Sequence, residues 1–138
     1  MSTRLRAILL SILIALAIGL TAGCQKKDQP TTSLTQHQWR EVKRHLLEDA
    51  PQPDYPIGAN FEGKIELIGF DVDGELEPGN DVTFTWYWKA LKDLDKNWEI
   101  FVHFDHKSDG YRQHLDHQPL DGLYQTGRWS EGQIIKDV

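Results

Sequence analysis

Four of the six histidines in this chain lie within one short segment, residues 103–117. Those four are His103, His106, His114 and His117, and they are interleaved with Asp105, Asp109 and Asp116. Imidazole and carboxylate groups at this density are ligands that zinc and copper favour in proteins. If residues 101–105 and 111–116 pair as a hairpin, His103 and His114 approach each other across the two strands. One hypothesis is therefore a metal-binding protein that uses His103, His106, His114, Asp116 and His117.

The spacing of these ligands matches no closed zinc motif, because there is no His-Glu-x-x-His and no cysteine pair. The alternative is that the histidines lie in solvated loops without a metal. Other chemistry finds little support. No Gly-x-Ser-x-Gly elbow and no glycine-rich phosphate loop occur. Asp71-x-Asp73-Gly74 opens like a calcium loop, but the twelfth position is Val82, which has no oxygen ligand. We expect a non-enzymatic protein with no cofactor.

Two aromatic residues in loop-rich sequence offer a different kind of site. Tyr124 and Trp129 lie between Pro119 and the last predicted strand. Exposed aromatic rings in such loops stack on sugar rings, which makes both residues candidates for ligand binding. The alternative is that the two rings pin their own loop onto the edge of the domain.

The first residues of the chain are typical of an exported protein. Arg4 and Arg6 precede an apolar run from Ala7 to Leu20, about the length of a signal-peptide core and shorter than the roughly 20 residues of a membrane-spanning helix. Leu20-Thr21-Ala22-Gly23-Cys24 then resembles the bacterial lipobox. That resemblance implies cleavage before Cys24 and lipidation of its thiol. Cys24 is the only cysteine, and a thioether there explains a lone thiol in an exported protein.

These features predict a lipid-anchored protein of the bacterial cell envelope, with a signal peptide over 1–23 and a flexible polar tether over 24–33. Gln25, rather than aspartate, follows the cysteine, which favours the outer membrane over the inner membrane. Loss of Arg4 and Arg6 changes the formal charge from −6 to about −8. An acidic surface argues against nucleic acid. The expected partners are the membrane, through the anchor on Cys24, and an envelope protein or a glycan.

The sequence after the tether predicts one short amphipathic helix over 34–50. Thr35 and Gln38 fit a capping box, and Trp39, Val42 and Leu46 follow at helical spacing. We expect Pro51 and Pro53 to end this helix.

The remaining residues, 57–138, alternate short apolar runs with turns. The clearest run is 82–88, where Val82, Phe84, Trp86 and Trp88 share one face that we expect to be core. Further strands are predicted over 64–70, 98–104 and 111–115 and from residue 133 onward. Short strands joined by turns, with no long helix, indicate a mainly β domain built as an antiparallel β-sandwich.

Several spaced residues also resemble an uncharacterised β-sandwich module of bacterial lipoproteins and of some membrane glycosyltransferase-like proteins. The matching residues, spread over the last 79 positions, are Phe61…Ile65-x-Leu67-x-Gly69-Phe70, Pro78-Gly79-x-x-Val82, Trp86-x-Trp88-x-Ala90-Leu91, Phe101-Val102-His103-Phe104, Asp116-x-x-Pro119-x-x-Gly122-x-Tyr124 and Trp129-x-x-Gly132…Asp137. The resemblance implies a jelly-roll or immunoglobulin-like sandwich and no catalytic residue.

The resembled pattern continues past its last aspartate with further strands, whereas this chain stops one residue after Asp137. We therefore expect either a shortened reading frame or a sheet edge supplied by another chain. An unpaired strand edge next to residues 134–136 would promote association with other chains.

Overall fold

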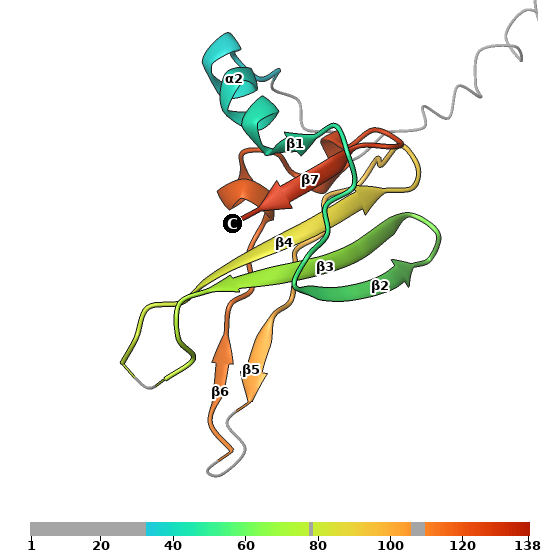
Figure 1. Ribbon diagram of the computed structural model, residues 1–138. Coiled ribbons are helices and arrows are strands. Elements are labelled where there is room, and N and C mark those ends of the chain that lie inside the picture. Colours follow the sequence, from blue (N-terminus) through green and yellow to red (C-terminus); the bar gives the residue numbers. More distant parts are fainter. Residues whose placement is uncertain (1–32, 78, 106–109) are drawn as a thin grey trace, which may run out of the picture.

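A computed structural model describes residues 33–77, 79–105 and 110–138. The protein is mainly β within this part of the chain: one five-stranded antiparallel sheet, one two-stranded sheet and one α-helix (Figure 1). The predicted signal peptide, Cys24, nearly all of the tether and His106 lie outside the described residues. No helix within the described ranges has the length and hydrophobicity needed to cross a membrane.

The described elements are one α-helix, seven strands and two short 3₁₀ helices. They are α2 (Gln36–His45), β1 (Leu46–Leu47), β2 (Tyr55–Phe61), β3 (Ile65–Asp73), β4 (Thr83–Ala90), β5 (His103–Asp105), β6 (Arg112–His114), η1 (Pro119–Gly122), η2 (Thr126–Arg128) and β7 (Ile134–Asp137). The strand order in the large sheet is β1-β7-β4-β3-β2, and β5 pairs with β6 in the small one.

Helix α2 begins with the predicted capping box. The Thr35 hydroxyl accepts a hydrogen bond from the Gln38 N–H at 3.2 Å, and the Gln38 side chain accepts one from the Thr35 N–H at 2.9 Å. Both bonds satisfy backbone donors that a helix start leaves without partners. The helix ends at His45, earlier than the predicted residue 50, because the next two residues form β1 and pair with β7. Val42 is the helix residue that is fully buried in the core.

Strands β3 and β4 form the longest pairing in the sheet, and a polar bond lies on one face of it. The Tyr87 hydroxyl donates to a carboxylate oxygen of Asp71 at 2.7 Å, and burial together with this bond raises the pKa of Tyr87 to about 12. The other oxygen of Asp71 accepts from the Asp54 N–H at 2.7 Å. Asp71 is therefore a strand residue whose two carboxylate oxygens each have a structural partner.

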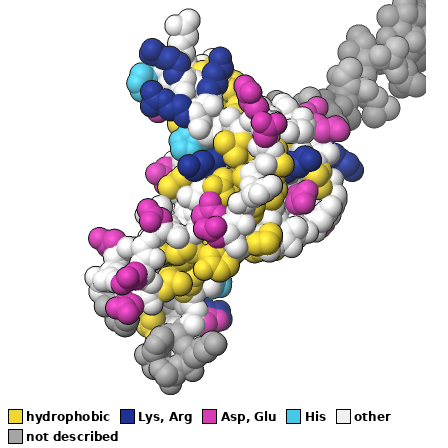
Figure 2. All heavy atoms as spheres, in the orientation of Figure 1, with side chains coloured by type: hydrophobic (Ala, Val, Ile, Leu, Met, Phe, Trp, Pro, Cys, Tyr) yellow, Lys and Arg dark blue, Asp and Glu magenta, His cyan; other side chains and the backbone are white. Residues whose placement is uncertain are grey.

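The face of β4 that was expected to be core is buried only at one end. Trp88 and Ala90 are buried, whereas Phe84 and Trp86 are half-buried and stack on each other with ring centroids 5.8 Å apart. Phe104 of β5 packs on Phe84 at a centroid distance of 4.8 Å. Hydrophobic side chains, yellow in Figure 2, accordingly appear on the viewed face of the molecule, while lysine and arginine gather around α2.

Strand β7 is not at an edge of the sheet. It pairs with β4 on one side, from Trp86 to Lys89, and with β1 on the other. The expected unpaired edge is therefore wrong at Ile134 and Ile135, because the two residues after α2 pair with them.

The predicted strand over 98–104 is also mostly absent. Only His103 to Asp105 are in a strand, and Ile100 makes an isolated bridge with His117. Two side-chain bonds account for the shorter strand. The Trp98 N–H donates to the Thr126 hydroxyl at 2.7 Å, which ties the first predicted residue to the 119–129 segment. The Asp116 carboxylate accepts from the Val102 N–H at 3.0 Å, which interrupts the pairing between the Ile100–His117 bridge and β5. The hydrophobic core fills the space where the large sheet, α2 and this segment meet.

Candidate functional site

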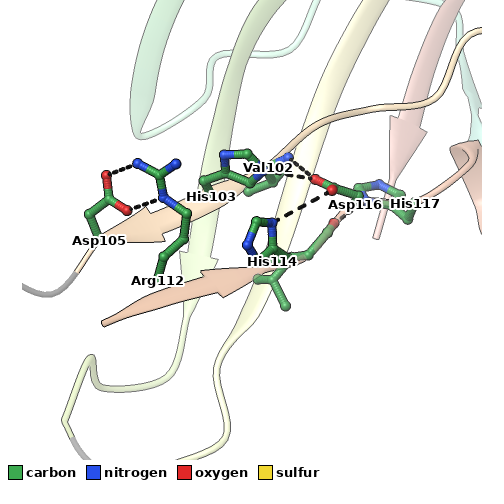
Figure 3. Close-up of polar contacts among 8 residues, drawn as sticks. Val102, His103, Asp105, Arg112, His114, Asp116 and His117 are labelled. Atoms are coloured by element: carbon green, nitrogen blue, oxygen red, sulfur yellow. Dashed lines mark hydrogen bonds and ion pairs between the residues drawn. The ribbon is translucent and has the colours of Figure 1, made fainter. Parts of the chain in front are cut away.

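The β5–β6 hairpin brings together the histidines that the sequence singled out. In its antiparallel register His103 lies directly opposite His114, as predicted, and Phe104 lies opposite Gln113. The two imidazole rings contact each other edge to face with centroids 4.4 Å apart. Figure 3 shows both rings on the same side of the hairpin, turned toward Asp116.

Asp116 follows β6 and places its carboxylate between the two imidazoles. One carboxylate oxygen lies 3.5 Å from His103 Nε2, and the other lies 3.9 Å from His114 Nδ1. The Val102 N–H donates to Asp116 Oδ1 at 3.0 Å, which fixes the orientation of the carboxylate (Figure 3). Each of the three side chains has one ligand atom within 4.8 Å of the others. His103, His114 and Asp116 are thus the predicted ligands that the fold assembles.

His117 does not join this group. Its ring donates from Nδ1 to the Leu115 carbonyl at 2.8 Å and from Nε2 to the Asp137 carboxylate at 2.9 Å. Both partners are acceptors, so these two bonds favour the protonated form of the ring. Partial burial alone would lower the pKa of His117, but the bonds to Leu115 and Asp137 outweigh burial and raise this pKa. Both nitrogens of His117 already have structural partners, so the fold does not bring this residue into the group of His103, His114 and Asp116, and its role as a ligand stays a prediction.

A bidentate ion pair occupies the next position along the hairpin. Arg112 donates from Nε and Nη2 to the two carboxylate oxygens of Asp105, at 2.6 and 2.9 Å (Figure 3). The guanidinium lowers the pKa of Asp105, and both side chains are solvent-exposed. The positive charge of Arg112 is therefore neutralised beside the two imidazoles instead of repelling a cation there.

The two aromatic candidates, Tyr124 and Trp129, belong to the core. Each side chain is only 1% exposed, so neither forms an open stacking platform, and a ligand-binding role for the two residues stays a prediction. The Trp129 indole N–H donates to the Tyr124 carbonyl at 2.9 Å, and the Tyr124 hydroxyl donates to Gln133 at 3.0 Å. The alternative interpretation holds, since the aromatic rings pin the loop to the domain.

A concave surface does exist beside the buried rings. It is a cleft of about 440 Å³ between the β2–β3 turn and the chain after Trp98. Five aromatic residues line it: Phe61, Trp88, Trp98, Phe101 and Trp129. Glu62, Lys64 and Glu99 supply charge. The Lys64 ammonium lies 5.5 Å above the Trp98 ring and 2.7 Å from the Glu62 carboxylate.

Asp137 was missed as a structural residue. It is 1% exposed, and its carboxylate accepts from His117 and, at 2.8 Å, from the Leu120 N–H. Leu120 and Asp121 both have positive φ, a strained conformation that this anchor helps to hold. An aspartate directly after the apolar residues of the strand predicted from residue 133 onward was the available sequence signal.

Comparison with models of protein families, with curated proteins and with solved structures finds no match to this chain. The resemblance to envelope β-sandwich modules stays a prediction, and the interpretation of the site relies on its geometry.

Proposed function

We propose that this chain is a lipid-anchored protein of the bacterial cell envelope whose mainly β domain binds a glycan and catalyses no reaction. The anchor is supported by the basic start, the apolar run and the lipobox-like Leu20-Thr21-Ala22-Gly23-Cys24. Lipidation at Cys24 holds the domain at the membrane, and we propose the outer membrane because Gln25 follows the cysteine.

The aromatic cleft is the observation that carries the binding proposal. Phe101 is 72% exposed and Phe61 is 51% exposed, so two large rings face solvent at the rim of a concave surface. Concave sites that combine aromatic walls with a few polar groups are the usual form of small-ligand sites.

The charged groups of the cleft favour a glycan over a purely apolar ligand. The Glu99 carboxylate accepts hydrogen bonds from hydroxyl groups, and the Lys64 ammonium donates to ring or hydroxyl oxygens. Sugar rings present apolar C–H faces to aromatic side chains and hydroxyl groups to such polar neighbours. An acidic mature chain also disfavours strongly anionic ligands.

The sandwich type of the domain is part of the same proposal. The small β5–β6 sheet contributes Phe104 against Phe84 of the large sheet, which is the contact expected where two sheets pack face to face. We propose that this pair of sheets represents a jelly-roll or immunoglobulin-like sandwich.

Binding of the full-length protein, solubilised in detergent, to immobilised cell-wall glycans and oligosaccharides tests the function. Phe101→Ala should weaken binding by about tenfold or more, because an exposed ring at the rim contributes stacking area without supporting the core. Leu76→Ala is the matched control, since Leu76 is 70% exposed and lies outside the cleft. Equal binding by Phe101→Ala and the parent protein, or no glycan bound by the parent, would contradict the proposal. If the parent protein binds another protein and Phe101→Ala does not, the result would instead favour a role as an accessory subunit of a protein complex.

The anchor has its own test. Cys24→Ala should abolish incorporation of labelled palmitate and leave the precursor uncleaved, because the thiol is the acceptor of the lipid. Unchanged labelling in this variant would overturn the assignment of Cys24, whatever the result with glycans.

A further inference from the structure

We propose that His103, His114 and Asp116 form a binding site for a divalent transition-metal ion on the β5–β6 hairpin. The site is separate from the aromatic cleft and does not depend on the proposed glycan function. Two imidazoles and one carboxylate are a donor set that suits zinc, copper and nickel far better than calcium or magnesium.

The distances between the donor atoms are close to those that a metal requires. A tetrahedral ion with bonds of about 2.0–2.1 Å holds its ligand atoms about 3.3 Å apart. His103 Nε2 lies 3.5 Å from Asp116 Oδ1, His114 Nδ1 lies 3.9 Å from Asp116 Oδ2, and one ligand atom from each of the three side chains lies within 4.8 Å of the others. His114 has the most exposed side chain of the three, at 61%, so its ring is free to rotate toward a bound ion.

The backbone holds these side chains in place before any ion binds. His103 and His114 are cross-strand partners, and the hydrogen bond from the Leu115 N–H to the Val102 carbonyl, at 2.8 Å, continues the ladder next to them. The Val102 N–H also binds Asp116 Oδ1, so the ligating carboxylate has a second partner that orients it. Hydrogen bonds that hold a ligand side chain from outside the coordination sphere orient it and increase metal affinity.

The local charges favour a cation. The negative charge of the Asp116 carboxylate is stabilised by a nearby positive charge. When both imidazole rings are neutral, a bound metal ion supplies that positive charge. Arg112 is paired with Asp105 two residues along the hairpin and does not oppose the ion. All three ligands remain accessible to water, so at least one coordination position stays open.

Titration calorimetry of the metal-free full-length protein in detergent with Zn²⁺ is the test. We expect one ion per chain. His103→Ala, His114→Ala and Asp116→Asn should each weaken Zn²⁺ binding by about tenfold or more, because loss of a direct ligand costs at least as much as loss of an outer contact. His37→Ala is the matched control: it removes an exposed imidazole from α2 and should leave the affinity unchanged.

A second measurement separates loss of the site from loss of the fold. Zn²⁺ should raise the thermal unfolding midpoint of the parent protein and not that of His114→Ala, while the two metal-free midpoints should coincide because His114 is exposed. Absence of Zn²⁺ binding by the parent protein would overturn the proposal. Binding that survives in both His103→Ala and His114→Ala would overturn it as well, since the ion would then lie elsewhere.

Discussion

The 119–129 segment and the β5–β6 hairpin looked alike in the sequence, yet the fold uses them in opposite ways. Both are rich in loop residues and carry side chains that bind ligands in other proteins. Tyr124 and Trp129 are 1% exposed and form part of the core. His103 and His114 are partly exposed, on a hairpin that contacts the large sheet mainly through Phe104.

The difference comes from what each segment gains by burial. Indole and phenol rings bring a large apolar area, and each finds a carbonyl or amide partner for its single polar group. When imidazole and carboxylate side chains are buried, the free energy of hydration that they lose exceeds what new contacts return, unless they pair with charged groups. An aromatic loop therefore folds inward and a histidine-rich hairpin stays at the surface.

Replacing Trp129 is the strongest way to test this contrast. Trp129→Ala should lower the free energy of unfolding by about 3–5 kcal/mol, because it leaves a large cavity and an unpaired Tyr124 carbonyl. His114→Ala should change it by less than about 0.5 kcal/mol. Urea denaturation followed by circular dichroism measures both. Similar losses in the two variants would mean that the hairpin is as integral as the loop.

Asp137→Ala tests the anchor that holds the start of the buried segment. The carboxylate is the acceptor for the Leu120 N–H and for the His117 ring, so its removal leaves two donors without a partner. We expect a loss of about 1–3 kcal/mol in the free energy of unfolding, again from urea denaturation. Asp95→Ala is a suitable control for the loss of an exposed carboxylate. Equal stability of the two variants would argue against the anchor.

Tyr124→Phe removes only a hydroxyl group from the buried segment and should cost about 1 kcal/mol at neutral pH. Burial raises the pKa of Tyr124 above its ordinary value. A phenol with a raised pKa contributes stability that is complete below about pH 10 and is lost as the pH rises through the folded-state pKa. The stability difference between parent and variant should therefore shrink in alkaline solution. A difference that grows above pH 10 would contradict this sign.

Arg112→Ala should have the smallest effect. The ion pair with Asp105 is fully exposed, and such pairs contribute little because water and salt screen them. We expect the thermal unfolding midpoint to remain unchanged within error at both low and high salt. A clear, salt-dependent decrease would show that the tip of the hairpin contributes to the stability of the domain.

Local patterns in the sequence were sufficient for several elements. Thr35 and Gln38 predicted the start of α2 because a capping box depends on residues three positions apart. Alternation predicted β3 and β4, and the spacing of the histidines predicted the pairing of His103 with His114. The mainly β class followed from these local signals. The jelly-roll or immunoglobulin-like type stays a prediction.

Contacts between distant residues decided the rest. Helix α2 ends at His45 because Leu46 and Leu47 pair with a strand almost ninety positions later, which no local pattern reveals. The backbone at Trp98 leaves the expected strand because Thr126 binds it from another loop. His117 binds Asp137 instead of joining His103, His114 and Asp116, and Trp129 turns inward, for the same reason. By itself the sequence determined which chemical groups this protein has and which strands can form. Only the tertiary structure decided which of those groups face solvent, because burial depends on partners that the chain brings together after it folds.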